Sequence, residues 1–130
     1  MRIGELAERT GLSLRTIRFY EEVGVLAPAP RTKGGFRSFT DNDLERLLLV
    51  RKMKPLGFSV EEMRTLVAAV EGLAASATQA ARAEATLIVG EYRTRVAERA
   101  ALLREQARRA KDFAEDLGAL VDDRSVEVSR

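Results

Sequence analysis

The strongest structural signal in this sequence is residues 10–24, TGLSLRTIRFYEEVG. Ser13 is a natural N-cap, so a helix is expected to begin at the next residue and to end before Gly24. A preceding helix over residues 3–10 carries its apolar residues at helical spacing and ends at Gly11. Two short helices joined by such a tight turn predict a helix-turn-helix.

The composition changes in residues 28–39, where prolines and glycines exclude a helix. Gly34 and Gly35 stand between two short flanking runs, so we expect a small β-hairpin, or wing, with a glycine turn. Phe36 follows this turn and is expected to pack in the core. The wing would complete a winged helix-turn-helix.

A central helix is expected after the wing. Thr40 is its N-cap, and Asp43 stands where a capping box places an acidic residue. Its apolar stripe, within residues 44–53, is wider than one face requires, which indicates a helix at the centre of the core. Pro55 should shorten or kink this helix at Lys54, because proline disfavours a helical residue before it.

The next two helices are separated by a candidate hinge. Ser59 and Glu62 form a Ser-x-x-Glu capping box for a helix that is expected to run to Gly72. The following segment, residues 73–79, is rich in Ala, Ser and Thr and is the hinge candidate. Residues 80–121 contain no proline and predict one long helix.

Apolar residues recur every seven positions along residues 80–121, which is the heptad pattern of a coiled coil. A helix this long cannot bury its seam on so small a domain, so it requires a second chain. The predicted dimer interface consists of Val89, Tyr92, Val96, Leu103, Ala110, Phe113 and Leu117. Arg99 and Gln106 are polar interruptions of the seam.

The predicted fold is therefore mainly α-helical and has four parts. Residues 1–72 form a winged helix-turn-helix domain, and residues 73–79 form the hinge. Residues 80–121 form the coiled-coil dimerisation helix, and residues 122–130 form a flexible tail.

The composition excludes several function classes. The chain contains no Cys and no His, which excludes disulfides, thiolate metal sites, Cys-ligated iron–sulfur clusters and His-based acid–base catalysis. We therefore expect no enzyme and no cofactor. The sequence shows no secretory signal and no long apolar run, so we expect a cytoplasmic protein without membrane contact.

Four stretches resemble the MerR family of transcription regulators: TIRFYE at 16–21, GFRSF at 35–39, DLERL at 43–47 and LGFSVEE at 56–62. The resemblance covers residues 1–70. It implies a homodimer that binds double-stranded DNA at a palindromic promoter site, joined by an antiparallel coiled coil. It also implies that the dimer distorts an over-long promoter spacer so that RNA polymerase can engage it.

The second helix of a helix-turn-helix enters the major groove and presents its N-terminal residues to base edges. Arg15, Thr16 and Phe19 form a contiguous outward patch for this contact, with Arg15 suited to guanine and Phe19 to a thymine methyl. Arg18 and Tyr20 are better placed for phosphates. The two arginines could instead be ordinary solvated charges, and Tyr20 could pack its ring in the core.

Three further residues complete the predicted DNA contacts. Arg37 on the wing is expected to bind a phosphate in an adjacent groove. Phe39 stands where relatives usually carry Tyr, so the missing hydroxyl puts one phosphate contact in doubt. Lys54 would flank the backbone as part of a second wing, or simply be solvated.

The sequence leaves alternatives open for both the effector and the class of function. Without Cys, thiolate metal sensing and iron–sulfur sensing are rejected. A small organic ligand at the hinge, a protein partner on the tail, or no effector at all remain, and the sequence favours no dedicated pocket. The alternatives to a regulator are an excisionase-like DNA-bending protein and a coiled-coil protein-interaction adaptor.

Overall fold

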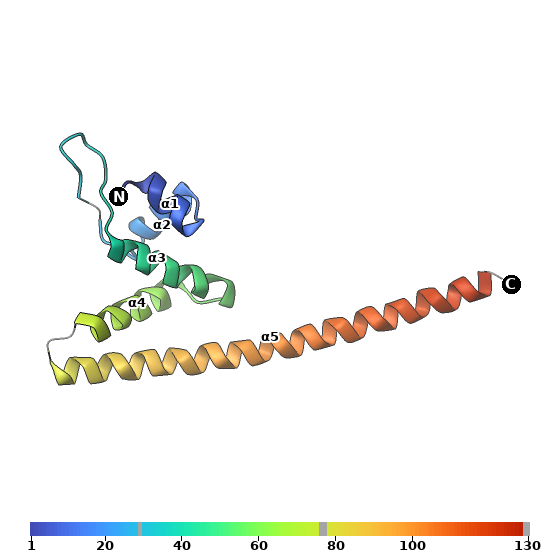
Figure 1. Ribbon diagram of the computed structural model, residues 1–130. Helices are drawn as coiled ribbons and strands as arrows, with labels where there is room; N and C mark the ends of the chain where they lie inside the picture. Colours follow the sequence, from blue (N-terminus) through green and yellow to red (C-terminus); the bar gives the residue numbers. More distant parts are fainter. Residues whose placement is uncertain (29, 76–77, 129–130) are drawn as a thin grey trace. The chain divides into compact units, whose positions relative to one another are not determined.

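The computed structural model describes residues 1–28, 30–75 and 78–128, with side chains described up to residue 123. The chain divides into two compact units, Met1–Tyr92 and Arg93–Arg130. The described elements, shown in Figure 1, are α1 (Ile3–Thr10), α2 (Leu14–Glu22), α3 (Asp41–Met53), the 3-10 helix η1 (Lys54–Leu56), α4 (Val60–Ala75) and α5 (Gln79–Val128).

The helix starts and stops agree with the local sequence signals. Gly11 ends α1 with a φ of 72°, a left-handed conformation that glycine adopts without strain. The Thr40–Asp43 capping box at the start of α3 is present in both directions. Ser59 and Glu62 form the equivalent pair of hydrogen bonds before α4, at 2.8 and 3.1 Å.

Pro55 has the expected effect on α3. The helix ends at Met53, and the chain continues as the 3-10 helix η1 with the proline in its first turn. Proline is tolerated there because the N–H groups of a first turn have no helical partner. Gly57 then reverses the chain with a φ of 85° before α4 begins.

The expected β-hairpin is not confirmed. Residues 30–39 form a loop whose one bridge joins Arg31 and Arg37 in antiparallel fashion, and the described residues contain no strand. The turn is closed by the Gly35 amide, which donates to the carbonyl of Thr32 at 2.9 Å. We keep the name wing for residues 30–39.

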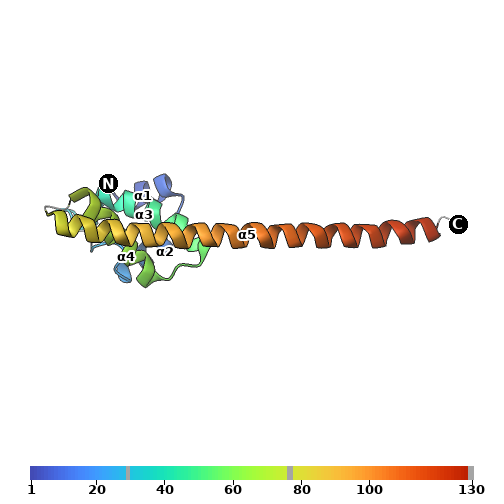
Figure 2. The same ribbon diagram turned by 90° about the horizontal axis from the view of Figure 1, so that it is seen from below.

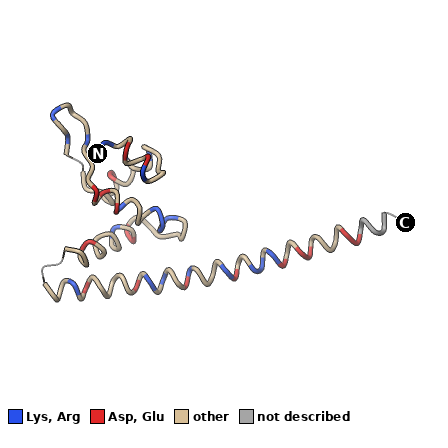
Figure 3. The backbone as a smooth tube through the Cα atoms, in the orientation of Figure 1, with Lys and Arg blue, Asp and Glu red and all other residues tan. Residues whose placement is uncertain are grey.

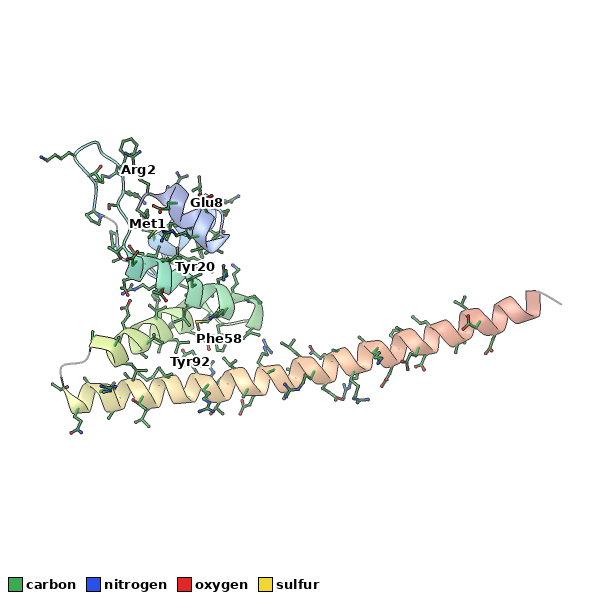
Figure 4. The ribbon with its side chains drawn as sticks, viewed as in Figure 1. Met1, Arg2, Glu8, Tyr20, Phe58 and Tyr92 are labelled. Carbon is green, nitrogen blue, oxygen red and sulfur yellow. The ribbon has the colours of Figure 1, made fainter. Side chains whose placement is uncertain are left out.

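The prediction for Phe36 was wrong. Its side chain is 51% exposed, and the guanidinium of Arg2 lies 4.0 Å from its ring centroid, near the label of Arg2 in Figure 4. Phe39 is the aromatic residue of the wing that enters the core, with 2% exposure. Without a regular strand, alternation along the wing does not assign the inward face.

The core of the first unit is apolar and draws on every α-helix of that unit. Leu6, Ile17, Leu26, Leu47 and Val50 are fully buried and belong to one contiguous cluster. Leu47 and Val50 lie on α3, which therefore has the central position that its wide apolar stripe predicts.

Three arginines of α3 and α4 bind backbone carbonyls at the ends of α1 and α2. Arg51 donates to the carbonyl of Thr10 at 2.5 Å and Arg64 to that of Val23 at 2.6 Å. Arg46 donates to the carbonyl of Val25 at 3.1 Å. Cations at helix C-termini satisfy carbonyls that have no helical partner and complement the negative end of the helix dipole.

Arg46 also joins α3 to α4. Its Nη2 donates to Glu71 Oε2 at 2.5 Å and its Nε to Glu71 Oε1, while Asn42 donates to the same Oε1 at 2.9 Å. This contact lowers the pKa of Glu71, chiefly through the hydrogen bond from Arg46. The network links the end of α4 to the segment that follows α2.

The hinge and tail boundaries differ from the sequence prediction. Helix α4 extends to Ala75 rather than ending at Gly72, and α5 begins at Gln79. Residues 76–77 of the expected hinge lie outside the described residues. The expected flexible tail is helical to Val128, and residues 129–130 also lie outside the described residues.

The first turns of α5 pack on α4 of the same chain, and the two helices lie side by side in Figures 1 and 2. Tyr92 is 5% exposed, and its hydroxyl donates to the carbonyl of Glu62 at 3.1 Å. The centroids of the Tyr92 and Phe58 rings are 5.7 Å apart, and both residues are labelled in Figure 4. Tyr92 therefore belongs to the core of its own unit and not to a dimer seam.

The second unit is the remainder of α5, from Arg93 on. Figure 3 shows acidic and basic residues interspersed along it. Arg108 pairs with Glu105 and Asp112, and Arg109 pairs with Glu105, all at the i, i+3 or i, i+4 spacing of neighbours on a helix surface. Within the described residues, no helix is long and apolar enough to cross a membrane.

Candidate nucleic-acid interface

The second helix, α2, is fixed at both ends. Its N-cap Ser13 accepts the amide hydrogen of Thr16 at 3.1 Å, and the Ser13 hydroxyl donates to Thr16 Oγ1 at 2.9 Å. At its C-terminal end, the amides of Val25 and Leu26 both donate to the carbonyl of Tyr20. Because its ends are held, the outward face of α2 has a defined orientation on the first unit.

The outward face of α2 carries cations and apolar groups together. Arg15, Arg18 and Phe19 are exposed, and Thr16 is half-buried. Ile17, on the opposite side, is fully buried. The structure thus brings the predicted base-reading patch to one accessible surface. Its contact with DNA stays a prediction.

Tyr20 and Phe39 do not lie on this surface. Tyr20 is 1% exposed and Phe39 2% exposed, and both belong to the core cluster. Burial raises the pKa of the Tyr20 hydroxyl because the phenolate would be poorly solvated. The predicted phosphate contacts of these two residues are therefore withdrawn, since neither side chain is accessible.

Arg37 lies on the wing and forms an ion pair with Glu21 near the end of α2. Its side chain is 40% exposed, whereas that of Glu21 is 11% exposed. Glu21 Oε2 is buried and has no hydrogen-bond partner among the described residues. The sequence analysis missed Glu21, because no local pattern shows that the wing folds back on α2.

Lys54 is exposed at the first position of η1, beside the proline-containing turn. It stays a candidate for a phosphate contact from this turn.

Leu14 is a candidate DNA-contact residue that the sequence analysis did not single out. It is an exposed apolar residue in the first turn of α2, next to Arg15. The available signal was its place directly after the N-cap, where the side chains of a helix-turn-helix approach base edges.

The predicted seam residues divide into two groups. Val89 packs against the core cluster of the first unit, as Tyr92 does. The other predicted seam residues follow Arg93 in the sequence and are exposed: Val96, Leu103, Ala110, Phe113 and Leu117.

The described residues contain no group of three or more His, Cys, Asp or Glu side chains that could hold a metal ion. The candidate interface offers guanidinium groups, the exposed Lys54 and the exposed apolar side chains of Leu14 and Phe19 on α2. Guanidinium groups bind phosphates and guanine edges, and apolar groups contact thymine methyls.

The capped second helix, its exposed cationic face and the wing beside it define a helix-turn-helix protein of the DNA-binding class. Residues 1–70 match the family model described as the MerR HTH family regulatory protein. The chain belongs to the MerR family.

Similar proteins include curated transcription regulators, one of them named for heavy metals. The chain is 44% identical over 68 residues to heavy metal-dependent transcription regulator 2 of Rhizobium meliloti, a match that covers 52% of this chain and 46% of that protein. The HTH-type transcriptional regulator CueR of Yersinia pestis is 43% identical over 68 residues, covering 52% and 49%. The chain thus spans about half the length of these curated relatives.

Two solved structures resemble most of the chain. One is described as a MerR family transcriptional regulator from Listeria monocytogenes; it is 32% identical, covers 89% of this chain and 83% of its own, and has a TM-score of 0.67. HiNmlR, a MerR family regulator lacking the sensor domain, was solved bound to promoter DNA. It is 27% identical, covers 75% of this chain and 74% of its own, and has a TM-score of 0.51.

Proposed function

We propose that this protein is a transcription regulator that binds a two-fold-symmetric promoter site as a homodimer in the cytoplasm. The observation that carries the proposal is the exposed face of α2, where Arg15, Arg18 and Phe19 stand outward over a buried Ile17. Such a face combines base-edge recognition with phosphate contact. HiNmlR, a relative of this chain, was solved bound to promoter DNA, which supports the same role for this chain.

The dimer is proposed from the second unit. Large apolar side chains there remain exposed, including Val96, Leu103, Phe113, Leu117 and Leu120. Their heptad spacing is that of a coiled-coil seam, which buries its apolar residues only against another helix. The proposed seam therefore begins after Tyr92, because the preceding turns already pack on α4.

The proposed mechanism follows the resemblance to the family. Phosphate contacts from both protomers would hold the DNA, and part of their binding free energy would bend and untwist an over-long promoter spacer. RNA polymerase would then engage both promoter elements. A metal ion bound by thiolates is not the effector, because the 130 residues of this chain contain neither Cys nor His.

A gel-shift titration tests the function. The probe is the DNA upstream of the protein's own gene, and the control is the same fragment with its inverted repeat scrambled. We expect specific binding at least about a thousandfold tighter than binding to the scrambled fragment. Equal affinity for both fragments would contradict a sequence-specific regulator and favour an adaptor with an incidental basic surface.

Arg15→Ala is expected to relax discrimination at one base pair of each half-site, at a cost of about 1–3 kcal/mol, because a bidentate contact with guanine would be lost. Affinities for a set of single-base-pair variants of the site measure this effect. Arg82→Ala, an exposed arginine of α5, is the control and should leave discrimination unchanged. Identical base preferences in wild type and Arg15→Ala would exclude Arg15 from base recognition.

Arg37→Ala is expected to weaken binding to all sequences to a similar degree, because a phosphate contact carries no sequence information. The slope of the logarithm of affinity against the logarithm of salt concentration should fall by roughly one for each protomer's contact. Filter binding at several salt concentrations measures the slope. An unchanged slope would remove Arg37 from the phosphate contacts.

A further inference from the structure

The wing has few contacts that hold it on the first unit. Residues 30–36 are exposed, and several hydrogen bonds of the wing join wing residues to one another. At its base, Phe39 enters the core and exchanges backbone hydrogen bonds with Met1. The ion pair between Arg37 and Glu21 joins the wing directly to α2.

This ion pair is asymmetric. Glu21 is nearly buried, whereas Arg37 reaches the surface. The contact joins Arg37 Nη1 to Glu21 Oε1, and Glu21 Oε2 has no partner in the described part of the chain. A guanidinium group has five N–H donors in a fixed plane. The carboxylate therefore contacts one nitrogen of the guanidinium and leaves other donors available to a phosphate.

The surroundings of this pair carry charges of both signs. A groove between the start of α1, the end of α2 and the wing is lined by Arg2, Arg18 and Arg37. Glu5, Glu21 and Glu22 line the same groove, so its formal charges balance. A DNA phosphate that approaches Arg37 here would meet its guanidinium group while Glu21 contacts one of its nitrogens.

We propose that Glu21 is a positioning residue that holds the wing arginine, Arg37, in the orientation in which it binds a DNA phosphate. This inference rests on the proposed function. A long arginine side chain loses much rotational freedom when it binds a phosphate. Glu21 removes part of that freedom before DNA arrives, so less is lost on binding.

The opposite effect is also physically conceivable, since a carboxylate near the DNA repels phosphates and competes for the guanidinium. The geometry favours positioning. Only 11% of the Glu21 side chain is exposed, and it contacts Arg37 through one Nη1–Oε1 pair, so other N–H donors of the guanidinium remain available. Glu22, its exposed neighbour, carries the same charge without that pair and therefore provides a matched control.

The test is a double-mutant cycle on promoter DNA with Glu21→Gln, Arg37→Ala and the double variant, using full-length protein. Glu21→Gln is expected to weaken binding about fivefold to tenfold, within the range for immobilising one long side chain on binding. In the Arg37→Ala background the same change should have no further effect. Glu22→Gln should bind as tightly as wild type or slightly tighter. Glu21→Asp should recover part of the lost affinity.

Each other outcome overturns the inference. Tighter binding by Glu21→Gln than by Glu22→Gln would show that Glu21 competes with DNA. An equal loss with and without Arg37 would show a general structural role. If wild type itself does not prefer the promoter fragment over its scrambled control, the proposed function fails, and the inference fails with it.

A second readout needs no DNA. In wild type, the side-chain N–H signals of Arg37 in NMR spectra should show slow rotation and slow exchange with water, and Glu21→Gln should abolish both. The signals of Arg15, which has no such pair among the described contacts, should not change. Fast exchange at Arg37 in wild type would show that Glu21 does not hold it in solution.

Discussion

Leu103→Asp is expected to yield monomers and to lower the affinity for a two-fold-symmetric promoter site by at least about a hundredfold. Leu103 is an exposed leucine at the centre of the proposed seam. A charge at this position would be buried against the partner helix, which coiled coils do not tolerate without a compensating group. A monomer also loses the gain in affinity from binding two half-sites at once, which reaches 10²–10⁴ in linked systems.

Light scattering coupled to size-exclusion chromatography measures the oligomeric state, and a DNA titration measures the affinity. Ala101→Asp is the matched control, because Ala101 is exposed on the same helix and lies outside the heptad seam positions. This control should remain dimeric and bind DNA as wild type does. If Leu103→Asp is still dimeric at micromolar concentration, the seam is assigned to the wrong face of α5.

Glu71→Ala is expected to lower the free energy of unfolding by about 1–3 kcal/mol at neutral pH. Removing one partner of a buried ion pair costs about 3–5 kcal/mol, and solvent reduces this cost because the side chains of Arg46 and Glu71 are 22% and 29% exposed. The change also removes the acceptor that orients Arg46 toward the carbonyl of Val25. Urea unfolding followed by circular dichroism measures the loss. Glu45→Ala, an exposed carboxylate on α3, should change stability by less than about 0.5 kcal/mol.

The same pair predicts the direction of a pH effect. Arg46 holds the pKa of Glu71 below its ordinary value in the folded protein. The contribution of Glu71 to stability is therefore fully present above the ordinary glutamate pKa of about 4.3 and is lost as the pH falls through the lowered folded pKa. The difference between wild type and Glu71→Ala should shrink over that acidic range. A difference that grows on acidification would contradict the assignment.

Local signals in the sequence predicted the parts of the fold that depend on a few neighbouring residues. The cap at Ser13 and the stop at Gly11 lie within one helical turn of the bonds that they control. The break at Pro55 is equally local. These features are correct because backbone hydrogen bonding at a helix end depends mostly on the residues at that end.

The parts that the sequence did not predict depend on which surface covers which residue. The heptad pattern identifies Tyr92 as apolar and inward-facing, but it cannot distinguish a partner helix from α4 of the same chain. Phe36 and Phe39 carry similar side chains, and only the path of the wing determines which one enters the core. The Glu21–Arg37 pair depends on the same path.

The arginines that hold α1 and α2 in position bind backbone carbonyl oxygens, which every residue type carries. Arg46, Arg51 and Arg64 would make these contacts whatever side chains occupied the outward positions of α2. The outward residues of α2 can therefore be exchanged for others during evolution, or by design, while the helix keeps its position. A library of variants at Leu14, Arg15 and Phe19 would be a practical route to altered operator preference on an unchanged scaffold.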